Sequence, residues 1–156
     1  MLTAKVYQYA LMSLEGTPAV FARLLDGLSE TEADLRPDPA RFSLREAVAH
    51  LADWEDVFRQ RMLLTQSEDN PLLQGYDEGQ WAIDRAYAQT DWREQLARFA
   101  HERAQTIALV RSFTPEHLAR IGHHTEAGPI TLQEQVLLIT VHDGYHARQF
   151  AEYRSA

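Results

Sequence analysis

Apolar residues recur at three- and four-residue steps along several stretches of the chain, which is the spacing that gives an α-helix one buried face. The pattern is clearest near the C-terminal end, where one stripe contains Leu132, Val136, Ile139, Phe150 and Tyr153. Similar stripes elsewhere predict four main helices, near residues 17–28, 43–65, 91–113 and 131–154. No comparable alternation of period two predicts a strand, so we expect an all-α protein without a sheet.

Helix starts are marked by residues that satisfy the first free backbone N–H groups. Residues 43–46 (SLRE) and 131–134 (TLQE) are both capping boxes, in which a hydroxyl residue is followed three positions later by glutamate. The segment from about Thr3 to Leu28 is expected to be helical with an interruption at residues 16–18 (GTP), where Thr17 can cap a fresh turn with Pro18 in its first position.

The connection over residues 66–90 has no clear period and is long for a compact domain. Its aromatic residues Tyr76, Trp81 and Tyr87 favour an ordered crossover over a flexible linker. A long connection also allows two successive helices to run parallel. We therefore predict a four-helix bundle of up-down-down-up order, in which the second helix is antiparallel to the fourth.

His142 and His146 are the strongest candidates for a functional site. They are four residues apart, so they share one helix face, and they fall in the apolar stripe of the last helix. A buried imidazole needs a hydrogen-bond partner or a metal ion to offset its desolvation. The spacing alone leaves both interpretations open, because the chain contains seven histidines and such pairs also arise by chance.

His50 joins this pair if the predicted topology is correct. It lies about 15 residues from the end of the second helix, and His142 and His146 lie about 11 and 15 residues from the start of the fourth. At 1.5 Å per residue, an antiparallel arrangement places the three at the same depth to within roughly 6 Å. The adjacent His123 and His124 fall in a predicted loop and are expected to be solvated.

Composition narrows the possible chemistry. The chain of 156 residues is predicted to form one domain, 1–156, and its net charge of −8 argues against nucleic acid as a partner. No apolar run predicts a membrane span or a secretory signal, so a cytoplasmic location is expected. Because there is no cysteine, a metal must be held by His, Asp or Glu, and any thiolate must come from a substrate.

Several short segments carry a resemblance to a known family. Residues 50–55 (HLADWE) and 142–149 (HDGYHARQ), together with residues 36–39 (RPDP) and the segment from Tyr76 to Trp81, resemble the DinB/YfiT-like family of metal-binding four-helix bundles. The resemblance covers nearly the whole chain from about Thr17. One departure is Phe42, which stands where the family has tryptophan.

The resemblance implies one divalent metal ion, zinc or nickel, held by His50, His142 and His146. It also implies reactions on small molecules, including transfer of low-molecular-weight thiols and hydrolysis of related adducts, and it makes a homodimer reasonable. Three imidazole ligands leave a fourth position for water or a substrate thiol, which the metal would acidify into a nucleophile.

Other side chains are candidates for supporting roles. Asp53 and Asp143 are the nearest carboxylates by sequence that could orient the histidine rings, the alternative being solvated or arginine-paired charges. Residues proposed to line a substrate pocket are Trp54, Tyr76, Trp81 and Arg103. No side chain is assigned as the catalytic nucleophile, because that role falls to the metal-bound water or the substrate thiolate.

The leading hypothesis is thus a metal-dependent enzyme that acts on a small molecule, with S-transfer as its reaction. One alternative is a hydrolase of the same fold. A second is a bundle that binds metal for structure, sensing or a stress response without catalysis. A third is a metal-free interaction protein whose histidines are hydrogen-bonded core residues.

Overall fold

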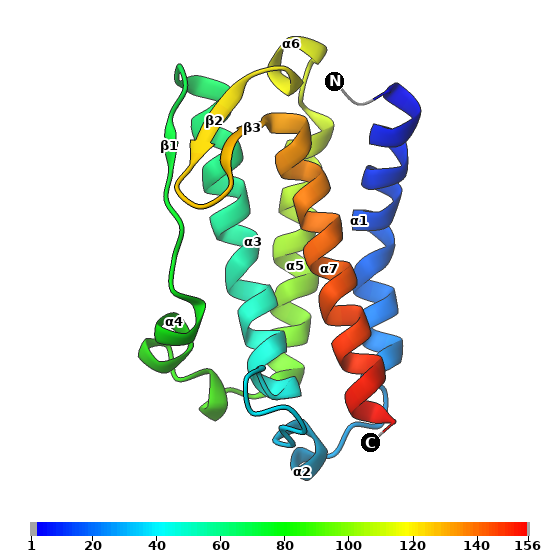
Figure 1. Cartoon of the computed structure of the whole chain (residues 1–156). Helices are drawn as coiled ribbons and strands as arrows, with labels where there is room; N and C mark the ends of the chain where they lie inside the picture. The colour runs from blue at the N-terminus through cyan, green and yellow to red at the C-terminus, as the bar shows by residue number, and fades with distance from the viewer. Residues whose placement is uncertain (1–2, 156) are drawn as a thin grey trace.

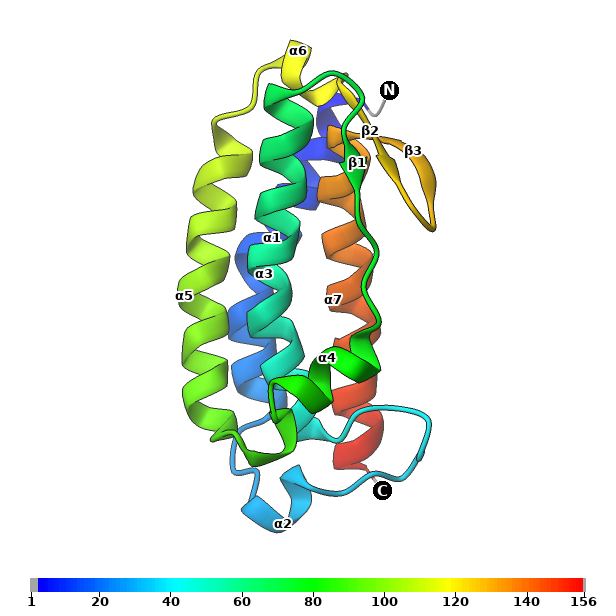
Figure 2. The same cartoon turned by 90° about the vertical axis from the view of Figure 1, so that its left-hand side faces the viewer.

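The computed structural model describes residues 3–155, so the predicted domain limits at residues 1 and 156 lie outside the described residues. Four long helices pack lengthwise (Figures 1 and 2): α1 (Ala4–Leu24), α3 (Leu44–Ser67), α5 (Trp92–Arg111) and α7 (Leu132–Arg154). The helices α3 and α5 run in one direction, and α1 and α7 run in the other. The predicted bundle of up-down-down-up order is confirmed, with α3 antiparallel to α7.

The first long helix starts near Thr3, as expected, but passes through Pro18 without the predicted interruption. A proline at this position cannot donate to the carbonyl of Leu14, four residues back. Arg103 Nη1, from α5, donates to that carbonyl instead at 3.4 Å, and Thr17 Oγ1 donates to the carbonyl of Ser13 at 2.9 Å. The predictions of an interruption there and of a main helix starting only at residue 17 were wrong because a partner from another helix compensates for the lost hydrogen bond.

A small sheet covers one end of the bundle, so the prediction of no strands was also wrong. It contains β1 (Leu72–Leu73), which pairs parallel with β2 (Ile121–His124), and β3 (Gly128–Thr131), which pairs antiparallel with β2. A Cβ at Gly122 would lie 2.7 Å from Leu73 Cδ1, so only glycine allows this close approach. Strands this short, with glycine and proline among their residues, leave no alternating pattern in a sequence.

The long connection between α3 and α5 is an ordered crossover, as predicted. After β1 it forms α4 (Glu78–Asp84) and the 3₁₀ turn η1 (Tyr87–Gln89), which pack along the outside of the bundle (Figure 2). Two further short helices are α2 (Glu30–Ala33) and α6 (Pro115–Leu118). Among residues 3–155, no helix combines the length and apolar character needed to cross a bilayer.

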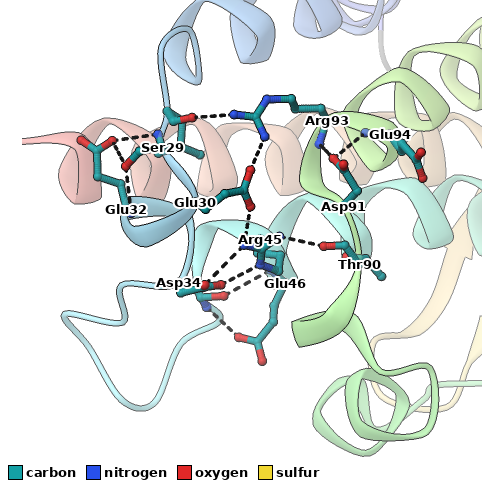
Figure 3. Close-up of polar contacts among 12 residues, drawn as sticks. Ser29, Glu30, Glu32, Asp34, Arg45, Glu46, Thr90, Asp91, Arg93 and Glu94 are labelled. Atoms are coloured by element: carbon teal, nitrogen blue, oxygen red, sulfur yellow. Dashed lines mark hydrogen bonds and ion pairs between the residues drawn. The ribbon is translucent and has the colours of Figure 1, made fainter.

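Charged contacts fix the end of the bundle where α3 starts (Figure 3). Both predicted capping boxes are present, at Ser43 for α3 and Thr131 for α7. Arg45 in the first turn of α3 bonds Asp34 at 2.6 Å, Glu30 at 2.8 Å and the carbonyl of Thr90 at 2.8 Å. This one guanidinium therefore ties α2 and the residue preceding the α5 cap to α3.

The two larger apolar clusters of the core are separated by a polar layer, and a third, small cluster lies where the crossover packs on α3. One of the larger two lies toward the α3 start and includes Phe21, Phe99 and Phe150. The other lies toward the small sheet and includes Leu14, Met62 and Val136. Between them along all four long helices lie buried polar residues: Thr17, His50, Glu55, Arg103, Thr106, Asp143 and His146. Polar side chains at this depth need partners, which makes the layer the place to look for function.

Candidate metal centre

The three histidines predicted to share one depth converge inside the polar layer. His50 projects from α3, and His142 and His146 project from α7, one helical turn apart. His50 Nε2 lies 2.9 Å from His142 Nε2, although the two residues are 92 positions apart in the sequence. One ring nitrogen from each of the three lies within 4.8 Å of the others. The antiparallel packing of α3 and α7 is what brings them together.

All three rings are held in the neutral form that a metal requires. Burial lowers the pKa of His50 well below its ordinary value, and the neighbouring histidines lower it further. Burial lowers the pKa of His142 to about 4, with a smaller contribution from the charge of Arg103. Burial, and then the proximity of His142, lowers the pKa of His146 to about 3. At neutral pH the cluster therefore offers lone pairs and no positive charge.

The donor set fits a divalent metal ion such as zinc or nickel. Without a metal, His50 and His142 could share one proton in a hydrogen bond between their Nε2 atoms. That hydrogen bond would leave the nearby ring nitrogen of His146 without a partner among the three rings. Three imidazole nitrogens at one point are a recognised zinc donor set. Among the described residues, no fourth His, Asp or Glu joins the group, so the metal would keep an open coordination position.

One ring is oriented by a glutamine that the sequence analysis did not single out. His146 Nδ1 lies 3.0 Å from Gln149 Oε1, and Gln149 Nε2 donates to the carbonyl of Phe42 at 2.6 Å. The spacing of three residues on a helix could have indicated Gln149. The Nδ1 atoms of His50 and His142 are buried and have no hydrogen-bond partner among the described residues.

The two carboxylates predicted to orient the histidines are bonded elsewhere. Asp53 Oδ2 accepts from Tyr87 Oη at 2.8 Å and from Arg85 at 3.0 Å, and its Oδ1 lies 2.7 Å from Arg98. Asp143 accepts from Arg103 and from Thr17. Both carboxylates are thus arginine-paired, the alternative that the sequence analysis left open.

Arg103 lies in a buried ion cluster and does not line the cavity described below, contrary to the prediction. Its guanidinium contacts Glu55 Oε1 at 2.7 Å and Asp143 at 2.7 and 2.8 Å, and it is 0% exposed. Thr106 Oγ1 donates to the second oxygen of Glu55 at 2.6 Å. This cluster lies directly behind the histidines, since Asp143 follows His142 in α7.

A cavity of about 260 Å³ opens beside His142. Two of the predicted pocket residues, Trp54 and Tyr76, line it, whereas Trp81 packs against both from outside, with ring centroids at 5.2 and 4.8 Å. The remaining lining residues come from α3, α4, the small sheet and α7: Phe58, Arg61, Met62, Glu78, His124, Glu126, Ala127, Ile130, Gln135 and Leu138.

Sequence reasoning missed several polar residues of this cavity, of which His124 and Arg61 are the most informative. His124 was expected to be solvated with His123, but it is half-buried, and its Nδ1 accepts from the backbone N–H groups of Glu126 and Ala127. In the neutral ring the proton is therefore on Nε2. Arg61 could have been noticed, because it follows Trp54 and Phe58 at helical spacing and places a charge in an apolar stripe.

Comparison with known proteins gives the same family as the sequence motifs. The model of the DinB superfamily matches residues 13–150. "Putative metal-dependent hydrolase YfiT" of Bacillus subtilis is 25% identical over 140 residues, covering 89% of this chain and 79% of that protein. A relative of the same designation from Oceanobacillus iheyensis is 25% identical over 134 residues, covering 85% and 77%.

Solved structures show the same fold. The structure of YfiT, described as an "unusual four-helix bundle topology", matches with a TM-score of 0.91 at 23% identity, covering 98% of this chain and 88% of that one. A mycothiol-dependent maleylpyruvate isomerase matches with a TM-score of 0.74 at 13% identity, covering 94% of this chain and 62% of that one. Sequence and fold thus agree, and the chain belongs to the DinB superfamily.

Proposed function

We propose that the protein is a metal-dependent enzyme that transfers a small-molecule thiol, with His50, His142 and His146 as the metal ligands. The observation that carries this proposal is the convergence of three neutral imidazoles, one of which, His142, lines a mostly apolar cavity, with no fourth ligand among the described residues. A structural metal site is normally closed by four protein ligands, whereas a catalytic site keeps one position for water or substrate.

The choice of a thiol rests on the chain's composition and on one relative. The chain has no cysteine, so a thiolate at this site must belong to the substrate. The isomerase that shares the fold is mycothiol-dependent, which supports thiol chemistry on this scaffold. When bound, a divalent metal lowers the pKa of a thiol or water that coordinates it and so makes it a nucleophile near neutral pH.

The chain's own residues supply position and exclusion of water. The three histidines hold the metal between α3 and α7, and Gln149 fixes the ring of His146 through Nδ1. The rings of Trp54 and Phe58 pack against His50 and His142 at 4.4 and 5.4 Å. These apolar rings keep bulk water from the ligands and leave the substrate to approach from the cavity.

Hydrolysis is the second candidate, supported by the designation shared by the relatives from Bacillus subtilis and Oceanobacillus iheyensis. In a hydrolase the same position would take water. The two reactions differ in whether a free thiol is needed and whether it appears in the product. They share the metal site, so loss of the site abolishes both.

The experiment has two steps. First, elemental analysis of the purified wild type and of His50→Ala, His142→Ala and His146→Ala should show a divalent metal, zinc or nickel, in the wild type alone. His123→Ala, an exposed histidine, is the matched control and should keep the metal. A wild type that neither retains nor takes up a divalent metal contradicts the site and leaves the hydrogen-bonded alternative.

Second, conjugation of 2-mercaptoethanol to 1-chloro-2,4-dinitrobenzene is compared with thiol-free release of 4-nitrophenol from 4-nitrophenyl acetate. Metal-dependent conjugation that His142→Ala removes supports the transferase. Metal-dependent release without thiol supports the hydrolase. Equal rates with and without metal in both assays contradict catalysis and leave a metal-binding bundle without enzymatic activity.

The proposal also includes a homodimer and a cytoplasmic location. Light scattering coupled to size-exclusion chromatography distinguishes a dimer from the 17.9 kDa monomer. Fractionation of the producing cells tests the location.

A further inference from the structure

The cavity beside His142 contains a guanidinium that forms no direct ion pair with any described residue, although Glu78 and Glu126 line the same cavity. Of the fourteen arginines, twelve form an ion pair with a carboxylate; in the described part of the chain, Arg23 and Arg61 form none. Arg23 is exposed on α1, whereas Arg61 is half-buried and lines the cavity. A partly buried guanidinium without a carboxylate is costly unless something else contributes the negative charge.

The contacts of Arg61 fix its guanidinium but leave a donor free. Its Nη2 donates to the carbonyl of Gln74 at 2.6 Å, and its Cζ lies 5.7 Å from the centre of the Tyr76 ring. Its Nε is buried and has no hydrogen-bond partner among the described residues. Burial lowers the pKa of Arg61, and the charges of Glu126 and Glu78 offset this only in part. An anion in the cavity could therefore accept a hydrogen bond from the Nε–H of Arg61, whose guanidinium is already oriented by its other contacts.

An aromatic wall connects this guanidinium to the histidines. Arg61 lies eleven positions after His50 in α3, but long helical side chains lean back toward the helix start. The Tyr76 ring beneath the guanidinium lies 6.5 Å from Trp54, and Trp54 lies 4.4 Å from His50. A ligand in the cavity can therefore reach both the guanidinium and His142 while covering apolar rings.

We propose that Arg61 binds the carboxylate of a substrate whose apolar body fills the cavity and whose reacting group lies beside His142. This inference rests on the proposed function, because the reacting group is placed by the metal site. A guanidinium matches a carboxylate in shape and charge. His124, whose neutral ring carries its proton on Nε2, lines the same cavity as a second donor.

The acids of the cavity favour a single negative charge over a phosphate dianion. Glu78 and Glu126 both line it. Partial burial and then the charge of Glu126 raise the pKa of Glu78, so negative charge is already crowded there. One arginine balances a monoanion better than a dianion at such a site.

The test uses two thiols of equal length, 6-mercaptohexanoate and 6-mercapto-1-hexanol, which differ in their carboxylate and hydroxyl ends. Binding to the cobalt-loaded protein is followed through thiolate-to-cobalt absorption bands. The wild type should bind the carboxylate about tenfold more tightly or better, the range expected for a hydrogen-bonded charge pair. The shorter pair 3-mercaptopropionate and 3-mercapto-1-propanol measures whether the distance to Arg61 matters.

Three variants decide whether Arg61 causes the preference. Arg61→Gln should abolish it while leaving the affinity for the alcohol unchanged, and Arg61→Lys, which keeps the charge without the fork, should retain part of it. Arg23→Gln removes an equally unpaired but exposed charge and should change nothing. Unchanged melting temperatures show that the variants fold. No preference in the wild type with either pair, or a preference that survives Arg61→Gln, overturns the proposal.

A separate measurement distinguishes this failure from failure of the proposed function. If no thiol changes the cobalt spectrum, the open coordination position is contradicted. The carboxylate site is then judged alone, by calorimetric titration of the same proteins with hexanoate and 1-hexanol. A preference for hexanoate that Arg61→Gln removes still supports the site, and its absence rejects it. If thiols bind cobalt without a carboxylate preference, the metal site stands and the carboxylate site falls.

Discussion

Two buried polar clusters lie side by side in the middle of the bundle, and their polar groups are compensated for the loss of water in different ways. In the ion cluster, Glu55 and Asp143 share the guanidinium of Arg103, and each carboxylate also accepts a hydrogen bond from a threonine. In the histidine cluster, His50, His142 and His146 are neutral, and ring nitrogens face one another. The buried charges of the ion cluster have partners within the protein, whereas the converging lone pairs of the histidines are suited to binding a cation. The comparison distinguishes a cluster suited to stabilising the fold from one suited to binding a ligand.

The largest expected effect comes from breaking the ion cluster. Arg103→Met leaves Glu55 and Asp143 buried without a counter-charge and removes the donor to the Leu14 carbonyl, so it should cost about 3–5 kcal/mol of unfolding free energy. Urea denaturation measures this. Arg111→Met, which breaks an exposed pair with Glu15, should cost at most about 1 kcal/mol. Equal losses in both variants would show that burial of the cluster has no energetic significance.

The histidine cluster should make the metal-free protein sensitive to acid. Below pH 6.5 the histidines become protonated in the unfolded chain. In the folded protein they stay neutral, because burial lowers the pKa of His142 to about 4 and of His146 to about 3. Stability is therefore complete above pH 6.5 and falls as the pH drops toward 4, by about 3 kcal/mol for His142 alone. Urea midpoints between pH 7.5 and 5 measure the loss before most carboxylates titrate.

His142→Leu is the test variant for this pH dependence, and His123→Ala is its control. The first should make the curve less steep, because it removes one of three buried rings whose pKa is lowered, and the second should leave the curve unchanged. A flat wild-type curve over the same range would mean that the folded rings accept protons as readily as free histidine.

A smaller effect should follow from removing the residue that orients His146. Gln149→Ala deletes the contact to His146 Nδ1 and should weaken metal binding by about tenfold to a hundredfold. Competition with a chromogenic chelator measures the affinity. Gln105→Ala, an exposed glutamine on α5, should bind metal as the wild type does. Undiminished affinity in Gln149→Ala would mean that the ring is held by packing alone.

The smallest effect is expected for histidines outside both clusters. His101→Ala and His123→Ala change exposed side chains, so each should stay within about 0.5 kcal/mol of the wild type in stability. Their metal content should also be unchanged. Loss of metal in either variant would show that the cluster in the polar layer is not the binding site.

Sequence reasoning found the histidine cluster because the necessary information is local or nearly so. The helical period places His142 and His146 on one face, and the long crossover allows α3 and α5 to run parallel, which makes α3 antiparallel to α7. Those two facts are enough to place His50 at the same depth. The bundle and its crossover follow from the same reasoning.

The ion cluster escaped prediction because its partners are distant in sequence. Arg103 is 48 positions from Glu55 and 40 from Asp143, and no local pattern indicates that these residues meet. Asp143 was assigned to the histidines because it adjoins His142, yet consecutive helical residues point about 100° apart. It therefore faces Arg103, whereas His142 faces His50. The contacts of Asp53 with Arg85 and Tyr87 likewise depend on the path of the crossover.

The separation of 92 positions between His50 and His142 has a consequence for folding kinetics. Contacts between distant segments form only after the loop between them has closed, so the complete set of three ligands exists only once α3 and α7 have docked. A metal ion that needs all three cannot guide the early steps of folding. If bound as proposed, the metal would instead lengthen the lifetime of the finished bundle, by slowing unfolding while leaving the rate of folding almost unaltered.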